Sequence, residues 1–342
     1  MTLDELALGE NGTSPITGFD DGNGNTMTRT RVALGRRADL GADCANCFGL
    51  CCVALAFAKS ADFPFDKDAG DPCTNLDDEN GCRIHPHLRE RGFSGCTVFD
   101  CSGAGQKVSQ HTFAGRSWRD DAETQRSMFA TFPVVRRLHD LLRYLDEAVT
   151  LVQEHGPATD SGRWADAFER VRARSDGTPA ELAVLDVDAE YARARPLLLE
   201  ASEIARAGGS PREGDRRLSP GADLVGADLR GVDLRRRTLR GSVAIAADLR
   251  GARLDRCDLL GVDLRDADVR GTDLRGALYL TQMQVNAARG DAATRLPQGF
   301  QRPRHWATPP VEPAEAQARP QATGATPRRR GRSGQAGRSR PR

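Results

Sequence analysis

The sequence predicts a multidomain protein with a Cys-rich metal-binding module, an α-helical middle segment and a short solenoid, flanked by disordered termini. Three observations indicate this fold class. Eight of the nine cysteines fall between residues 44 and 101. Apolar residues then recur at the three- and four-residue spacings of amphipathic helices. From residue 222 a five-residue pattern repeats eleven times. A chain of 342 residues is long enough for about two domains.

The changes in composition set the expected boundaries. Residues 1–40 are polar and lack periodicity, which predicts a disordered lead-in, and Met27 is a candidate start. We expect the Cys-rich module over residues 41–115, the helical segment over 116–210, and the solenoid with a C-terminal cap over 218–306. Residues 307–342 are rich in Pro, Gly and Arg and predict a disordered basic tail.

Composition also excludes several classes of function. The net charge is only +1, so the whole chain has no bulk preference for nucleic acid. No apolar run reaches the roughly 18 residues of a membrane span, and the N-terminus lacks an export signal. We therefore expect a cytoplasmic protein without a membrane partner. The sequence contains no phosphate-binding loop with a lysine, no HExxH and no Ser/His/Asp set, so we predict no enzymatic activity.

The dense cysteine cluster is the candidate site. Reducing conditions disfavour structural disulfides, so the cluster predicts metal binding or thiol chemistry. Two intervening residues let Cys44 and Cys47 reach one ion, and eight thiolates would fill two tetrahedral sites. Adjacent side chains point apart, so we expect Cys51 and Cys52 in different sites. The candidate ligands are Cys44, Cys47, Cys51, Cys52, Cys73, Cys82, Cys96 and Cys101, with His85, His87 and Asp100 in reserve.

Zinc is the metal we expect, because a polar, Gly-rich segment gains a core by folding around an ion. An iron–sulfur cluster, iron, or thiol exchange are the alternatives. The layout of Cys44 to Cys52 followed by Cys73, Cys82 and Cys96 resembles the zinc- or iron-chelating cysteine-cluster family. That resemblance covers about residues 44–101 and implies chelation by these cysteines.

The middle segment predicts helices. Pro133 suits the first turn of an amphipathic helix, and His139 is expected on its surface. A second helix should begin at Thr178, end at Gly208 and Gly209, and kink or divide at Pro196. A shorter helix is expected around residues 164–171. The apolar positions of the first helix are Val134, Val135, Leu138, Leu141, Leu142, Leu145, Ala148 and Val152.

The repeat from residue 222 places an apolar residue at every fifth position from Leu224 to Leu274. A small residue stands two positions earlier, Asp often one earlier and Gly often two later. A period of five fits neither one face of a helix nor one face of a strand, so each unit should form one side of a square coil. Arg237 and the unit at residues 242–246 depart from the pattern, and we expect distortion there.

Residues 222–276 resemble the pentapeptide-repeat family, which implies a right-handed quadrilateral β-helix. Thr281 and Gln284 predict a short capping helix, after which residues 291–306 should fold back onto the coil. Some members of that family mimic duplex DNA and protect topoisomerases. Such mimicry needs an acidic surface, whereas these units hold ten Asp and eleven Arg. The charge balance therefore disfavours DNA mimicry.

We accordingly predict a non-enzymatic scaffold that binds an unknown protein partner and carries a zinc-binding cysteine cluster. An iron–sulfur or thiol redox protein that handles metals is the alternative. Nucleic acid remains a partner only through the basic C-terminal tail.

Overall fold

The repeats from residue 222 wind into a four-sided coil with five residues on each side and twenty in each turn. The computed structural model describes residues 37, 39–156, 161–208 and 217–307. Parallel bridges join residues twenty apart, beginning with Asp223 to Val243 and continuing to Asp258 with Leu278. Each turn therefore stacks directly on the one before it, as the period of five predicts. Met27, most of the lead-in and the basic tail lie outside the described residues.

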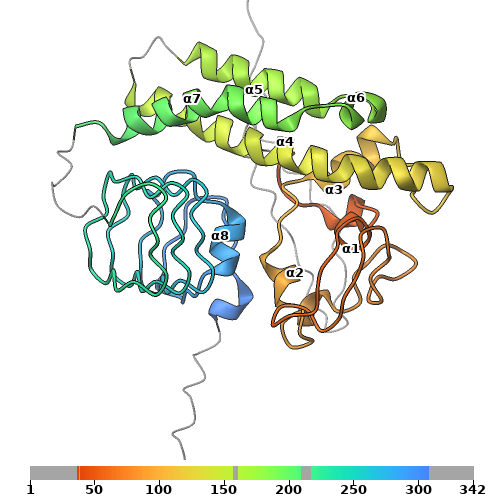
Figure 1. Ribbon diagram of the computed structural model, residues 1–342, viewed down its shortest axis with the longest axis horizontal. Helices are drawn as coiled ribbons and strands as arrows, with labels where there is room; N and C mark the ends of the chain where they lie inside the picture. Colours follow the sequence, from red (N-terminus) through yellow and green to blue (C-terminus); the bar gives the residue numbers. More distant parts are fainter. Residues whose placement is uncertain (1–36, 38, 157–160, 209–216, 308–342) are drawn as a thin grey trace, which may run out of the picture. The chain divides into compact units, whose positions relative to one another are not determined.

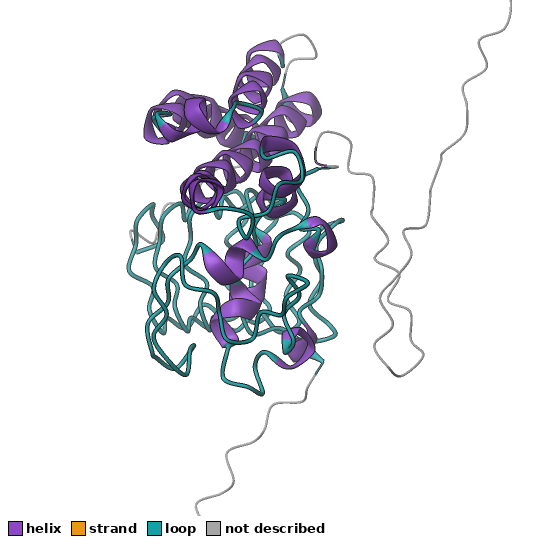
Figure 2. Ribbon diagram, turned by 90° about the vertical axis from the view of Figure 1, so that its right-hand side faces the viewer, coloured by secondary structure: helices purple, strands orange, loops and turns teal. Residues whose placement is uncertain are grey.

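The expected β-helix needs one correction, because the described residues contain single parallel bridges and no strand. Figure 2 shows the coil entirely as loop. The physical reason is the length of each side. A side has five residues and turns at both ends, so its hydrogen bonds to the next turn, such as those of Leu224 and Gly226 N–H to Val243 and Ile245, form a single bridge rather than a run of bridges. The coil winds as predicted, but its described residues form no β-strand.

Apolar side chains fill the inside of the coil. Leu234 is fully buried, and the central residue of every unit from Leu224 to Leu274 is at most 7% exposed. The distortion expected around residue 242 is absent. Ser242 is buried, its hydroxyl donates to the carbonyl of Ser219 at 3.2 Å, and the bridge between Val243 and Asp263 is intact. A small polar side chain is accommodated because it has a backbone partner.

The corners of the coil share one backbone conformation. The residue two positions after each centre has a positive φ from Gly226 to Gly271. Glycine occupies most of these corners, but Ala246 has φ +56° in the same place. Closure of the coil therefore imposes the left-handed conformation even on residues that pay a steric cost for it. The other non-glycine corners are Arg236, Arg256 and Asp266.

The C-terminal cap forms as predicted. Helix α8 (Gln282–Ala287) begins with a capping box between Thr281 and Gln284. Bridges from Arg289 to Asp268 and from Arg295 to Asp273 then continue the stacking beyond the repeats. The chain ends its described part at the short helix η5 (Arg304–Trp306), whose tryptophan is buried against the coil core. The cap thus covers the apolar end of the last turn.

Four helices form the middle segment: α4 (Ala122–His155), α5 (Gly162–Ser175), α6 (Pro179–Ala183) and α7 (Val187–Arg206). Helix α4 packs against the other three, and Figure 1 shows α4, α5 and α7 running side by side. Within the described residues, no helix is long and apolar enough to cross a membrane.

Two helix boundaries differ from the prediction. Asp121 caps α4 by accepting hydrogen bonds from the backbone of residues 123 and 124, so the helix starts eleven residues before the expected Pro133. Pro133 lies inside it. The predicted second helix does begin with a capping box at Thr178, but it divides before Val187 and runs without a break through Pro196. Asp186 starts the new helix by capping Ala189 N–H, a stronger local signal than the proline.

The Cys-rich module contains only short helices, joined by loops and by two antiparallel bridges. His139 of α4 is buried, not on the surface as expected, because its Nδ1 lies 2.7 Å from the carbonyl oxygen of Ser102. This contact attaches the module to α4. The short helices are η2 (Cys44–Asn46), α1 (Leu50–Val53), η3 (His85–His87), α2 (Ser94–Val98), α3 (Ala104–Gln106) and the π-helical η4 (Lys107–Thr112).

The coil is attached to α7 through one of its sides. Asp258 is 1% exposed, accepts a hydrogen bond from Ser202 of α7 at 2.6 Å and pairs with Arg240 at 2.6 Å. At the corners next to it, Arg236 and Arg256 donate to the carbonyls of residues 207 and 205 at the end of α7. Cations at a helix C-terminus stabilise its unpaired carbonyls. These two corners are among those that lack glycine.

Candidate functional site

The cysteines of the module form two neighbouring groups of free thiols. None of the nine cysteines is in a disulfide, and all nine lie in the described part of the chain. The first group contains Cys51, Cys52, Cys73, Cys82 and Cys96. The second group contains Cys44, Cys47 and Cys101. The ninth cysteine, Cys257, is buried inside the coil.

The first group is centred on Cys52. Its Sγ lies 3.9 Å from that of Cys51, and the Cys52 thiol is hydrogen-bonded to both Cys51 and Cys82. These bonds lower the pKa of Cys51, and that of Cys82 to about 6. Burial, together with the charges of Cys51, Cys73 and Cys82, raises the pKa of Cys96 to about 12. Five thiols therefore act on one another.

The sulfurs of Cys51 and Cys52 lie 3.9 Å apart, whereas the sequence predicts that these adjacent side chains point apart. Both lie in helix α1 (Leu50–Val53), whose N-cap residue Gly49 has φ +68°. Their sulfurs converge because the Cys52 side chain turns toward Cys51 and Cys82 instead of away from them. A backbone hydrogen bond of 2.9 Å from Cys73 N–H to the Cys52 carbonyl brings the segment that carries Cys73 alongside helix α1.

The second group is held by close backbone contacts. A Cβ atom built on Gly105 would lie 2.7 Å from the Cys47 sulfur, so that sulfur requires a glycine there, and 3.8 Å from the Cys101 sulfur, which is an ordinary contact distance. Burial raises the pKa of Cys47 to about 11, with smaller contributions from the charges of Cys51 and Cys44. Burial likewise raises the pKa of Cys101 to about 12, with smaller contributions from the charges of Asp100 and Cys44.

Backbone N–H groups point at both buried sulfurs of this group. Gly49 and Leu50 donate to Cys47, and Gly103 and Gly105 donate to Cys101. Such bonds stabilise a thiolate more than a thiol. The loops thus supply hydrogen-bond donors that stabilise a thiolate on sulfurs whose burial favours the neutral thiol. Metal-bound thiolates require such donors.

The donor set fits a thiolate-binding metal, although the side chains are not arranged around an ion. No group of three or more His, Cys, Asp or Glu among the described residues is placed to hold a metal as it stands. The 3.9 Å separation of Cys51 and Cys52 nevertheless matches the roughly 3.8 Å edge of a tetrahedral zinc site with 2.3 Å bonds.

The reserve ligands lie at the edges of these groups. His87 is exposed, and its Nδ1 lies 3.0 Å from a carboxylate oxygen of Glu90. Asp100 accepts a hydrogen bond from the Ser102 backbone at 2.8 Å, next to Cys101. His85 occupies the same short helix as His87. The sequence reasoning missed Lys67, which is buried beside the first group, because burial of a lysine has no local sequence signal.

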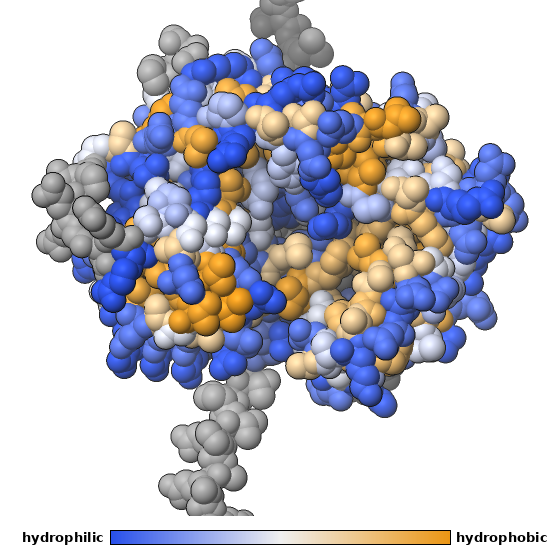
Figure 3. Space-filling view, in the orientation of Figure 1, coloured by the Kyte–Doolittle hydropathy of each residue, from blue (hydrophilic) through white to orange (hydrophobic). Residues whose placement is uncertain are grey.

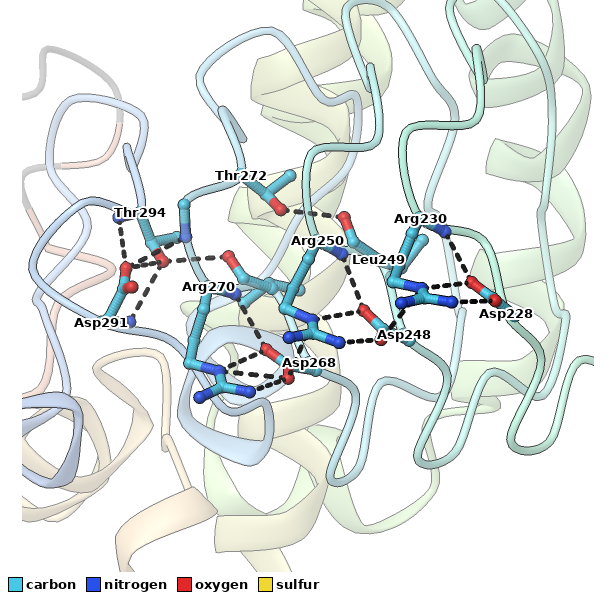
Figure 4. Close-up of polar contacts among 12 residues, drawn as sticks. Asp228, Arg230, Asp248, Leu249, Arg250, Asp268, Arg270, Thr272, Asp291 and Thr294 are labelled. Atoms are coloured by element: carbon cyan, nitrogen blue, oxygen red, sulfur yellow. Dashed lines mark hydrogen bonds and ion pairs between the residues drawn. The ribbon is translucent and has the colours of Figure 1, made fainter. Parts of the chain in front are cut away.

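The surface of the coil carries paired charges. Asp228, Asp248 and Asp268 occupy successive turns, and each accepts hydrogen bonds from the backbone and the side chain of the arginine two residues later. Figure 4 shows these pairs stacked in a row along one side. Arg250 also reaches Asp268 of the next turn at 3.5 Å. The row alternates in sign and has no net acidic field.

Comparisons with known proteins agree with the repeat. A family model for pentapeptide repeats matches residues 245–278 with eight copies. The uncharacterized protein YybG of Bacillus subtilis (strain 168) is 48% identical over 268 residues, which cover 78% of this chain and 95% of that protein. The chain belongs to the YybG family of pentapeptide-repeat proteins. The coil begins earlier than the matched repeats, with the bridge at Asp223, and the likeness to YybG extends far beyond the coil.

Proposed function

We propose that the chain is a non-enzymatic pentapeptide-repeat scaffold whose Cys-rich module is stabilised by zinc. The convergence of eight free cysteines into two adjacent groups carries this proposal. Zinc bound by thiolates would supply the module with a core that its short helices do not provide. The resemblance to the zinc- or iron-chelating cysteine-cluster family supports the same assignment.

The interior of the coil supports a scaffold over an enzyme. Its cavity, lined by leucines and by Ala244, Val262 and Val269, has a volume of only about 10 Å³. That is about the space of one water molecule, far below the volume of a substrate pocket. A partner would therefore bind the outside of the coil. Figure 3 shows an apolar patch framed by hydrophilic residues. Among the repeat residues, Val225 and Val243 are exposed large apolar side chains.

Metal analysis of protein purified without oxygen tests the zinc proposal. We expect colourless protein with about two zinc ions. The double variant Cys51→Ser, Cys82→Ser should lose about one ion, because two of its ligands are gone. Cys257→Ala is the matched control: it removes a buried thiol outside the module and should leave the zinc content unchanged.

Two other results would contradict the proposal. Brown protein that contains iron and sulfide would assign an iron–sulfur cluster. Metal-free protein whose thiols cycle reversibly with a dithiol reductant would assign thiol exchange, which the adjacency of Cys51, Cys52 and Cys82 favours as the second candidate. The neutral charge row of the coil continues to disfavour DNA mimicry.

A further inference from the structure

Lys67 is the one lysine of the chain that is buried. It is 6% exposed, whereas Lys59, eight residues earlier, lies on the surface. The Lys67 backbone pairs with Phe57 through two hydrogen bonds of 3.0 and 2.8 Å, which form an antiparallel bridge. Phe57 stacks on Phe63 with ring centroids 4.3 Å apart. The position of the lysine is therefore fixed by the surrounding loop.

The Lys67 ammonium is held by three backbone carbonyls. Its Nζ donates to the carbonyl oxygens of Val53 at 3.3 Å, Asp68 at 2.9 Å and Asp71 at 2.8 Å. All three of its N–H bonds are thereby used. Val53 directly follows Cys52, and Asp71 lies two residues before Cys73. The ammonium thus ties together the two chain segments that carry these thiols.

No carboxylate compensates this charge at close range. Within the described residues, no Asp or Glu oxygen forms an ion pair with Lys67, and the side chains of Asp68 and Asp71 are exposed. Among the charges that act on the ammonium, Cys73 has the largest effect, ahead of Asp71 and Cys52. A buried ammonium without a counter-charge is costly. The first cysteine group, through Cys73, is thus one source of opposing charge, and Asp71 is another.

We propose that Lys67 is the counter-charge of a metal–thiolate centre formed by the first cysteine group, and that it raises the affinity of that centre for zinc. The proposal rests on the zinc-binding function proposed above. A zinc ion with four thiolates carries a net charge of about −2, and one buried ammonium offsets half of it. Lys67 is a positioning and charge-balancing residue that touches no metal, because its three protons are already bound to carbonyls. It acts on the first group only, since the second group is held by the Gly103 and Gly105 loop.

The test measures zinc release from the full chain to a chromophoric chelator, for the wild type and for Lys67→Met, Lys67→Arg and Lys59→Met. Methionine keeps the length and apolar packing of the lysine but removes the charge. We expect Lys67→Met to lower the affinity of the chain for one of the two zinc ions about 10- to 100-fold, the usual range for groups that support a metal site. Lys67→Arg keeps the charge and should retain most of the affinity. Lys59→Met loses the same charge at the surface and should behave as the wild type.

The outcomes separate the two proposals. If Lys67→Met releases both ions as the wild type does, the role of Lys67 is overturned while zinc binding stands. If Lys67→Met and Lys67→Arg lower the affinity for both zinc ions equally, Lys67 only holds the loop and the charge proposal is wrong. The same conclusion follows if circular dichroism shows that neither variant folds. If the wild type binds no zinc, both proposals fail.

Discussion

The coil and the Cys-rich module both lack strands in their described residues, yet they are held together in opposite ways. In the coil every unit buries one apolar centre and bonds to the turns above and below it. In the module, residues 44–101 contribute fewer buried apolar side chains, and of the eight thiols Cys73 is buried, four are half-buried and three are exposed. The coil spreads its stability over many equivalent contacts, whereas the module concentrates it in a few groups.

Removal of zinc should give the largest difference between the two regions. Structural zinc contributes about 10–16 kcal/mol in small zinc-dependent domains, so a chelator should unfold the module. The coil has no such dependence and should keep its backbone hydrogen bonds. Hydrogen–deuterium exchange measures this: amides of residues 44–101 should exchange quickly after chelation and those of residues 222–280 slowly. Equal loss of protection in both regions would contradict the comparison.

Truncation of one centre of the coil should have the next largest effect. Leu254 is 1% exposed, so Leu254→Ala should cost about 2–5 kcal/mol of unfolding free energy. Zinc content should not change. The control is Val225→Ala on the outside of the coil, where the side chain is 57% exposed and the expected cost is below about 0.5 kcal/mol. Chemical denaturation measures both, and zinc loss from the Leu254 variant would show that the two regions are not independent.

Acid should affect the two regions at different pH values. Hydrogen bonds from Arg230 lower the pKa of Asp228 from 3.8 to about 2. Because the folded pKa is below the unfolded one, the carboxylate stabilises the coil above about pH 4, and this contribution is lost as the pH falls to about 2. If the module binds zinc as proposed, protons should compete for the thiolates and release the metal at a higher pH. A dye assay for zinc and exchange in the coil should therefore show two separate steps, with a small coil step because the pairs are exposed.

The smallest expected effect concerns the corners. Ala246 is exposed and adopts φ +56°, so Ala246→Gly should remove steric strain and stabilise the protein by about 0.5–1 kcal/mol. Gly241 has φ +67° in the neighbouring corner, with no atom within 4 Å of an added Cβ. Gly241→Ala should therefore cost about 1 kcal/mol through backbone strain alone. Thermal unfolding of the two variants should move in opposite directions; shifts of the same sign would show that closure does not impose the corner conformation.

The coil could be predicted closely because its contacts are encoded within five residues. The five-residue period predicted the four sides and the buried centres of the coil. The pair of Thr281 and Gln284 predicted the capping helix. The start of α4 was missed because Pro133 is acceptable both in a first turn and, at a cost, inside a helix supported by tertiary packing. A capping aspartate twelve residues earlier was the signal that decided it.

The candidate site could be predicted only in part. The cysteine count identified the eight candidate thiols, but their grouping depends on segments far apart in the sequence, such as those of Cys47 and Cys101, whose sulfurs both lie beside Gly105. The spacing of the cysteines does not predict that the Cys52 side chain points toward Cys51. The burial of Lys67 likewise results from the surrounding loop and not from its neighbours in the sequence.

The arginines at two corners of the coil bear on how the coil is rotated about its own axis relative to α7. A repeat with identical sides offers four equivalent ways to lie against a helix. Arg236 and Arg256 stand twenty residues apart at the same corner, and both bind the carboxyl end of α7. A coil with glycine at both positions would lose this distinction between its corners. The two departures from the repeat thus select which side faces α7, and so fix which sides remain outward for a partner.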